Sequence, residues 1–90
     1  MGRVVVRKID KHLGMRIAQA RSSSSISLDA GAAALELSVA DYDALERGER
    51  RVSAFALAIL SRQFDRPISW FYEGLPGQSV FRRDAKPSSV

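Results

Sequence analysis

The stretch that decides the fold runs from residue 26 to residue 48 and reads ISLDAGAAALELSVADYDALERG. It holds two short helical patterns, at residues 28–35 and 39–47, separated only by Glu36-Leu37-Ser38. Two short helices joined by a turn of three or four residues form a helix-turn-helix, whose second helix can enter the major groove of DNA. Because paired helices are common in small helical domains, the spacing by itself indicates the motif without assigning a function.

Three helices are predicted to begin in the same way, with an apolar residue, a serine and then a helical pattern. The pairs are Ile26-Ser27, Leu37-Ser38 and Val52-Ser53. The serine hydroxyl can accept a hydrogen bond from a free backbone N–H of the first turn, and the apolar residue can pack on the next turn. These signals predict helices at 28–35, 39–47 and 54–64, the second of which ends at Gly48.

The remaining sequence predicts two more helices and two flanking segments. A first helix at 10–22 ends in the serine run at 22–25, and a short fifth helix runs from Pro67 through Tyr72. We therefore expect an all-α domain of five helices at residues 10–74, with a basic N-terminal arm at 1–9 and a flexible tail at 75–90. The expected core consists of Leu13, Ile17, Ile26, Ala32, Leu35, Leu37, Tyr42, Leu45, Phe55, Ile59, Leu60, Phe64, Ile68 and Phe71.

A chain of 90 residues, 46% of them hydrophobic and 27% charged, has the composition of one globular domain. Without cysteine it has no disulfide framework, thiolate zinc site or cysteine nucleophile. His12, the single histidine, is expected on the surface of the first helix, and we expect no metal, no cofactor and no enzymatic activity. No apolar run approaches the ~18 residues of a membrane span, which favours a soluble, cytoplasmic protein.

The formal net charge of +4 favours a polyanionic partner. Basic residues are concentrated in residues 1–12 and again at Arg47, Arg50 and Arg51, whereas residues 13–48 hold more acidic than basic side chains. A prediction of nucleic-acid binding therefore depends on the arm and on these arginines.

Several motifs between Asp10 and Gly74 resemble those of one known family. They are Leu13-Gly14-x-Arg16-Ile17-x-x-x-Arg21, Tyr42-x-x-Leu45-Glu46-Arg47-Gly48 and Pro67-Ile68-Ser69-Trp70-Phe71-Tyr72-Glu73-Gly74. Together they resemble the helix-turn-helix regulators of the lambda-repressor and Cro type, also called the XRE family. The resemblance implies a five-helix lambda-repressor-like domain that regulates transcription in the bacterial or phage cytoplasm and binds double-stranded DNA as a homodimer.

The resemblance also implies roles for individual residues. Arg21 and Glu46 match a pair of side chains that joins the first helix to the end of the third, and such a pair fixes helix placement more than it adds stability. The aromatic run at 70–72 is implied to lie in the core and at a dimer interface. The positions implied to face DNA are Ser38, Val39, Ala40, Asp43, Ala44, Arg47, Arg50 and Arg51.

The predicted recognition helix departs from the family pattern. Base edges are read through paired hydrogen bonds by Arg, Lys, Asn and Gln, and none of these stands at residues 38–46. Leu28 replaces a glutamine that the family commonly places at the start of the second helix. Asp41 and Asp43 would repel phosphates, although Asp41 can also complete a capping box with Ser38.

Gly31 and Glu36 depart from the family too, since they replace a leucine and a turn glycine. A glycine inside a helix costs ~1 kcal/mol relative to alanine, so we expect Gly31→Ala to be neutral or stabilising. The missing side chain leaves space that Tyr42 or Trp70 can fill.

Two functions remain open. The first is a DNA-binding regulator whose affinity comes mainly from phosphate contacts made by the basic arm and the arginines at 47–51. The second is a protein-interaction module of the same fold that has lost sequence-specific DNA binding. Its partner would meet an apolar surface made of Leu28, Val39, Ala40 and Ala44. Val80 and Phe81 in the tail are candidates for a further contact.

Overall fold

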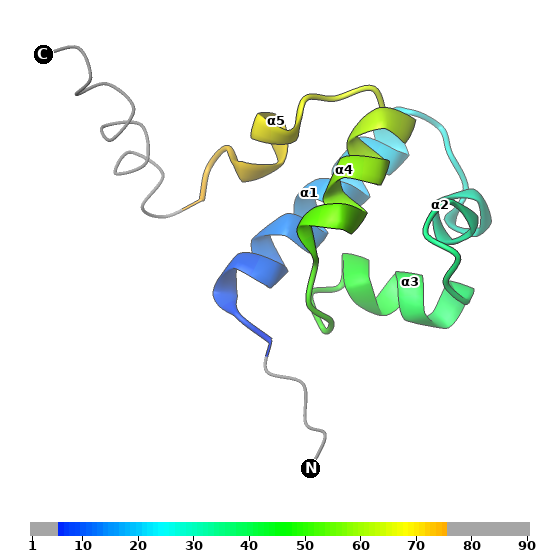
Figure 1. Ribbon diagram of the computed structural model, residues 1–90, viewed down its shortest axis with the longest axis horizontal. Coiled ribbons are helices and arrows are strands. Elements are labelled where there is room, and N and C mark those ends of the chain that lie inside the picture. The colour runs from blue at the N-terminus through cyan, green and yellow to red at the C-terminus, as the bar shows by residue number, and fades with distance from the viewer. Residues whose placement is uncertain (1–5, 76–90) are drawn as a thin grey trace, which may run out of the picture.

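The computed structural model describes residues 6–75, and this part of the chain consists of five α-helices without a strand (Figure 1). The helices are α1 (Lys8–Ser23), α2 (Leu28–Ala34), α3 (Val39–Glu46), α4 (Ala54–Gln63) and α5 (Ile68–Tyr72). The predicted all-α, five-helix fold is confirmed. Helix α1 starts two residues before the predicted position, inside the segment expected to be an arm, and the rest of that arm, the tail and its Val80 and Phe81 lie outside the described residues.

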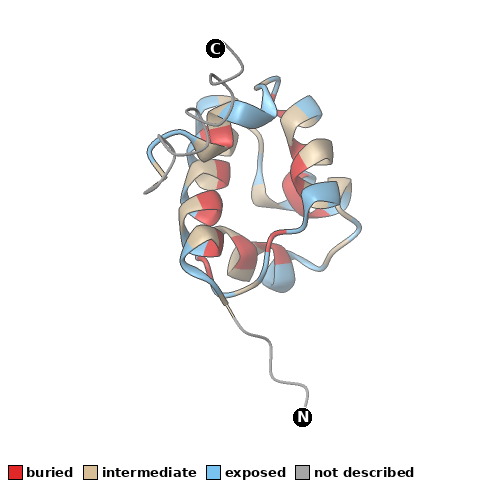
Figure 2. Cartoon of the chain, turned by 60° about the vertical axis from the view of Figure 1, so that its left-hand side comes forward, coloured by how far each residue is buried: buried red, intermediate tan, exposed pale blue. Residues whose placement is uncertain are grey.

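Helices α2 and α3 form a pair that packs against the other helices. Helix α3 contacts both α1 and α2, α4 contacts α2, and α5 contacts α1 and α4. In Figure 1, α5 lies on the opposite side of the domain from α2 and α3. Figure 2 shows the buried residues turned toward the space between the helices. The helix-turn-helix pair therefore leaves one face of α3 on the outside of the domain.

The three predicted serine caps are present. The hydroxyl oxygen of Ser27 accepts from Ala30 N at 3.1 Å, and that of Ser53 accepts from Ala56 N at 3.0 Å. Ser38 accepts from Asp41 N at 3.1 Å in the same way, but the Asp41 carboxylate reaches to Arg50 and does not complete the capping box. Each helix start is thus set by a contact within three residues, which is why the local sequence predicts it.

Each of the helices α1 to α4 is followed, two positions after its last residue, by a residue with left-handed backbone conformation. These residues are Ser25, Glu36, Gly48 and Asp65, with φ between 54° and 76°. In the α2–α3 turn, Glu36 N donates to Ala33 O at 3.0 Å and Leu37 N donates to Ala32 O at 2.9 Å, the two bonds of a Schellman motif. Glu36 therefore adopts a left-handed conformation that favours glycine, at the cost of backbone strain.

The core differs from the predicted one mainly along α4. Phe55 and Ile68 were expected inside but are exposed, Phe55 to 76%. The buried stripe of α4 consists of Leu57, Leu60 and Phe64, which are spaced by three and four residues. Phe55 lies two residues before Leu57 and so points away from that stripe. The complete set of buried hydrophobic residues in the described range is Leu13, Ile17, Ala20, Ala32, Tyr42, Leu45, Val52, Leu57, Leu60, Phe64 and Phe71.

The structure confirms that Tyr42 fills the space beside Gly31, and this contact favours a destabilising effect of Gly31→Ala in place of the neutral or stabilising one expected. A Cβ atom at this position would lie 2.7 Å from Tyr42 Cζ and 2.8 Å from Tyr42 Oη. The Tyr42 ring, which is fully buried, fills the space in place of a side chain on α2, whereas Trp70 is not among the contacts. Gly31 therefore permits the close packing of α2 on α3, and this contact outweighs the poor helix propensity of glycine.

We predict that Gly31→Ala lowers the free energy of unfolding by about 1–2 kcal/mol, because the added methyl group overpacks against a ring that cannot move. Ala33→Gly, at an exposed position of the same helix, is the matched control and should cost ~1 kcal/mol through helix propensity alone. In a Tyr42→Leu background the penalty of Gly31→Ala should disappear. Urea denaturation of the four variants measures these effects, and a more stable Gly31→Ala protein would contradict the packing described.

Asp10 is a fully buried acid that joins the start of α1 to the loop before α4. Its carboxylate accepts hydrogen bonds from Arg7 N, Nε and Nη2 at 2.9, 3.0 and 3.0 Å, and from Val52 N at 2.9 Å. Burial by itself would raise the pKa of Asp10, but these hydrogen bonds and the Arg7 charge outweigh it and lower the pKa to about 2. The charged form is therefore the one that stabilises the fold.

We predict that Asp10 makes the protein sensitive to acid. Because its pKa falls from 3.8 to about 2 on folding, its contribution of about 2 kcal/mol is complete above pH ~4 and is lost as the pH drops toward 2. Asp10→Asn should be less stable at neutral pH and should lose less stability between pH ~5 and 2. Equal losses in both proteins, measured by urea denaturation with Asp29→Asn as an exposed control, would refute the assignment.

Candidate nucleic-acid interface

The outer face of α3 carries the side chains that were predicted to face DNA. Tyr42 and Leu45 are buried, which turns the positions on the other side of the helix outward. Ser38, Val39 and Ala40 are exposed at its start, while Asp43 and Ala44 are half-buried. This face presents small, apolar or acidic groups and no side chain that could form paired hydrogen bonds with a base edge through nitrogen donors.

The arginines after α3 are paired with acidic side chains. Arg47 Nε lies 3.0 Å from Asp43 Oδ2, and Arg47 Nη2 lies 3.4 Å from Glu49 Oε1. Arg50 Nη1 lies 3.3 Å from Asp41 Oδ2. The i, i+4 spacing of Asp43 and Arg47 is a sequence signal for the first pair, whereas the pair of Arg50 with Asp41 depends on how the loop turns back along α3.

We call these residues, together with Arg51, the α3 charge cluster; its members are Asp41, Asp43, Arg47, Glu49, Arg50 and Arg51. Arg51 is exposed and has no ion-pair partner among the described residues. The cluster holds as many acidic as basic side chains. The patch that was predicted to be basic therefore has no net charge. Arg51 is its member without an acidic partner among the described residues, and its guanidinium can bind an anion.

An apolar groove of about 280 Å³ lies beside Arg50 and Arg51, between the α2–α3 turn and the start of α4. The exposed Phe55 stands in its wall. The other residues that line it are Leu35, Leu37, Leu45, Ser53, Ala56 and Ile59. By contrast, the apolar surface expected at Leu28, Val39, Ala40 and Ala44 is smaller than predicted, because Leu28 packs against the core.

Arg21 and Glu46 form a two-point ion pair between α1 and the end of α3. Arg21 Nε donates to Glu46 Oε2 at 2.6 Å and Arg21 Nη2 donates to Glu46 Oε1 at 3.2 Å. The third nitrogen, Nη1, donates to Ile26 O at 2.9 Å. The side chains are 18% and 7% exposed, so the pair is largely shielded from water. One guanidinium thus ties together α1, the link to α2, and α3.

Tyr42 lies next to this pair. Burial, together with the neighbouring Glu46 carboxylate, raises the pKa of the Tyr42 phenol, and the bond to Glu46 raises the pKa of Arg21. The Tyr42 hydroxyl is buried and forms no hydrogen bond of normal geometry with any described residue. It therefore stays protonated and contributes to packing, not to a polar network.

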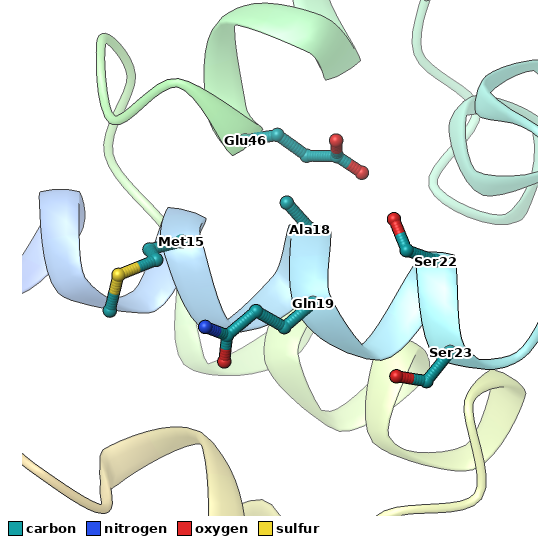
Figure 3. Close-up of a pocket in the computed structure, with 6 residues that line it drawn as sticks. All are labelled: Met15, Ala18, Gln19, Ser22, Ser23 and Glu46. Atoms are coloured by element: carbon teal, nitrogen blue, oxygen red, sulfur yellow. The ribbon is translucent and has the colours of Figure 1, made fainter.

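A shallow hollow of about 580 Å³ runs along the outer face of α1 (Figure 3). It is lined by Met15, Ala18, Gln19, Ser22, Ser23 and Glu46. The only charged side chain in it, Glu46, is already paired with Arg21. The hollow thus offers no free charge to a ligand.

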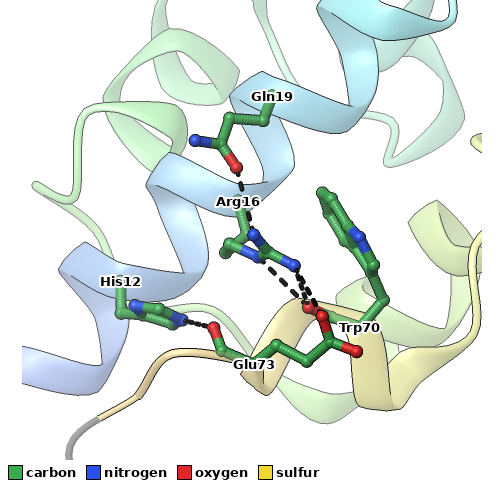
Figure 4. A network of polar contacts seen from close by, with 5 residues as sticks. All are labelled: His12, Arg16, Gln19, Trp70 and Glu73. Carbon is green, nitrogen blue, oxygen red and sulfur yellow. Dashed lines mark hydrogen bonds and ion pairs between the residues drawn. The ribbon is translucent and has the colours of Figure 1, made fainter.

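A separate polar network anchors α5 to α1 (Figure 4). Arg16 Nη2 and Nε donate to Trp70 O at 2.7 and 3.1 Å, and the guanidinium lies 3.7 Å from the centre of the Trp70 ring. His12 Nε2 donates to Glu73 O at 2.8 Å. Phe71 is fully buried, as predicted, whereas Trp70 is half-buried between Arg16 and Arg66. Trp70 therefore joins α5 to α1 through both its carbonyl oxygen and its ring.

Within residues 6–75, no three His, Asp or Glu side chains are grouped so that they could hold a metal ion. None of the helices in this range is long and apolar enough to cross a membrane.

The arrangement of α2, the short turn and α3 defines an all-helical protein with a helix-turn-helix. No known protein-family profile matches the chain. The chain is 29% identical over 71 residues to an uncharacterized HTH-type transcriptional regulator of Rickettsia prowazekii (strain Madrid E), an alignment that covers 79% of this chain and 55% of that protein. It thus spans about half the length of this curated relative.

The fold is similar to that in the crystal structure of the clp gene regulator ClgR from Corynebacterium glutamicum. The TM-score is 0.71 at 19% sequence identity, with 94% of this chain and 90% of that chain covered. At this level of identity the likeness concerns the fold alone, and it agrees with the helix-turn-helix architecture predicted from the sequence.

We predict that Glu46→Ala lowers the free energy of unfolding by about 3 kcal/mol, because Arg21 would be left as a shielded, unpaired charge. The control is Glu73→Ala, which removes an exposed acid whose partner, Arg16, keeps its hydrogen bonds to Trp70 O, and it should cost less than about 1 kcal/mol. Urea denaturation at neutral pH compares them. Equal losses would mean that the Arg21–Glu46 pair is no more important than a surface contact.

Proposed function

We propose that this protein is a DNA-binding transcriptional regulator of the lambda-repressor and Cro type, which acts as a homodimer in a bacterial cytoplasm. The observation that carries the proposal is the α2–turn–α3 unit, which leaves the outer face of an N-capped α3 exposed. The names of the two similar proteins, an HTH-type transcriptional regulator and a clp gene regulator, support it.

The residues of α3 favour binding through the phosphate backbone. Ser38, Val39, Ala40, Asp43 and Ala44 would face the groove, where they offer few hydrogen bonds for reading bases. Arg47, Arg50 and Arg51 follow at the end of the helix and would face phosphates. Arg51 is the strongest candidate, since it has no acidic partner in the described part of the chain.

A second candidate function is a protein-interaction module of the same fold. Phe55 favours it, because its 76% exposed ring and the apolar groove beside it form a continuous apolar surface of the kind that marks interaction sites. In this case the helix-turn-helix would serve as a scaffold, and DNA binding would be absent.

We predict micromolar or weaker affinity for duplex DNA, with little preference among sequences and a steep dependence on salt. Replacing Arg50 and Arg51 together by Ala should weaken binding about equally on all duplexes and flatten the salt slope by roughly one per lost phosphate contact. Arg62→Ala, at an exposed position of α4, is the control that shows how much the loss of one positive charge elsewhere on the surface weakens binding. Fluorescence anisotropy on a selected and a scrambled duplex measures both quantities.

Two results would contradict this mode of binding. A specificity ratio of ~10³ or more would mean that α3 reads bases directly. Undetectable binding at low salt would favour the protein-interaction module.

A further inference from the structure

The acidic side chains of the α3 charge cluster stand on the same surface as the arginines proposed to contact DNA. Asp41 and Asp43 lie on α3 itself, and Glu49 follows directly after Gly48, which ends the helix. Each of them lies within 3.4 Å of an arginine nitrogen. A phosphate that approaches Arg47 or Arg50 therefore also approaches a carboxylate.

These ion pairs are weak links, because every side chain in them is at least 40% exposed. Exposed pairs contribute little to stability, so an arginine can exchange its carboxylate for a phosphate at small cost. The carboxylate cannot leave the surface when this happens. It remains within a Debye length of the phosphate, about 8 Å at physiological salt, and repels it.

Asp41 stands in the first turn of α3, where its charge suits the helix dipole, but among the described residues none of the three acidic side chains holds α3 against another helix. Ser38 caps α3 without help from Asp41, and the placement of α3 depends on Arg21 and Glu46 on its other side. Neither Asp43 nor Glu49 contacts a residue outside the cluster through an ion pair in the described range.

We propose that Asp41, Asp43 and Glu49 limit the affinity of this surface for DNA by offsetting the charge of Arg47 and Arg50. This inference rests on the proposed function, and it assigns to the three acids the control of its strength. Replacing the three acids by neutral side chains of the same shape gives this surface a net positive charge and raises its affinity for DNA.

The test is a triple variant, Asp41→Asn with Asp43→Asn and Glu49→Gln, in the full chain. Amides preserve the shape of the side chains and their ability to accept from arginine, and all three sites are exposed enough to leave the fold intact. In fluorescence anisotropy with a mixed-sequence duplex at about 50 mM salt, the dissociation constant should fall at least about tenfold. The gain should shrink at higher salt.

Glu73→Gln is the control for loss of a single negative charge, to be compared with Asp43→Asn alone, because it removes one exposed carboxylate from the far side of the domain. It should change the dissociation constant less than about twofold. The single substitution Asp43→Asn should lower the dissociation constant by part of the amount seen in the triple variant. Circular dichroism melting of each protein verifies that the fold is retained.

The outcomes separate this inference from the proposed function. Binding by the native chain with an unchanged constant in the triple variant overturns the inference and leaves the function standing. Weaker binding by the variant overturns it as well, since the acids would then position the arginines for binding. If the loss is confined to one sequence, the acids would instead accept a hydrogen bond from a cytosine amino group. The absence of binding by all proteins at low salt overturns both.

Discussion

The ion pair between Arg21 and Glu46 fixes the position of α3 on α1, and the outer surface of the domain depends on that position. Helix α3 has eight residues, and a helix of this length has little stability alone, so its place is set by its contacts. The Arg21 guanidinium holds the end of α3 through Glu46 and the α1–α2 link through Ile26 O. On the adjoining side, the Tyr42 ring lies against Gly31 of α2. Helix α3 is therefore held against both of its neighbours, and neither its rotation nor its depth is free.

That fixed rotation decides what the protein can present to a partner. With Tyr42 and Leu45 inward, the outer face of α3 shows Val39 and Ala40 together with acidic side chains. Arg47 and Arg50 are balanced by those acids, and Arg51, which has no ion-pair partner among the described residues, lines an apolar groove. The geometry is that of a helix-turn-helix, whereas α3 itself contains no Arg, Lys, Asn or Gln. Under the proposed function, the strength of DNA binding is thus a question of charge balance more than of shape.

Much of the fold was predictable because its signals are local. Serine caps act within three residues, and the three that were predicted all form their hydrogen bonds. The number and order of the helices follow from these caps and from the apolar spacing. Helix ends were harder to predict, since Ser25, Glu36 and Asp65 adopt a left-handed conformation that the sequence signals clearly only for glycine, as at Gly48. The Arg21–Glu46 pair was identified through resemblance to a family, and no local pattern would have found it.

What the sequence by itself determined was the class of fold, the helix starts and the residue types available on α3. Only the tertiary structure decided which of these residues meet. In the folded protein, Asp10 is buried and accepts a hydrogen bond from Val52 N, and the Phe55 side chain is exposed. The Tyr42 ring packs against Gly31, and Arg50 forms an ion pair with Asp41. Each of these contacts joins two elements, and its free energy depends on how the elements are placed in three dimensions. Propensity and spacing describe one element at a time, so they carry no information about such contacts.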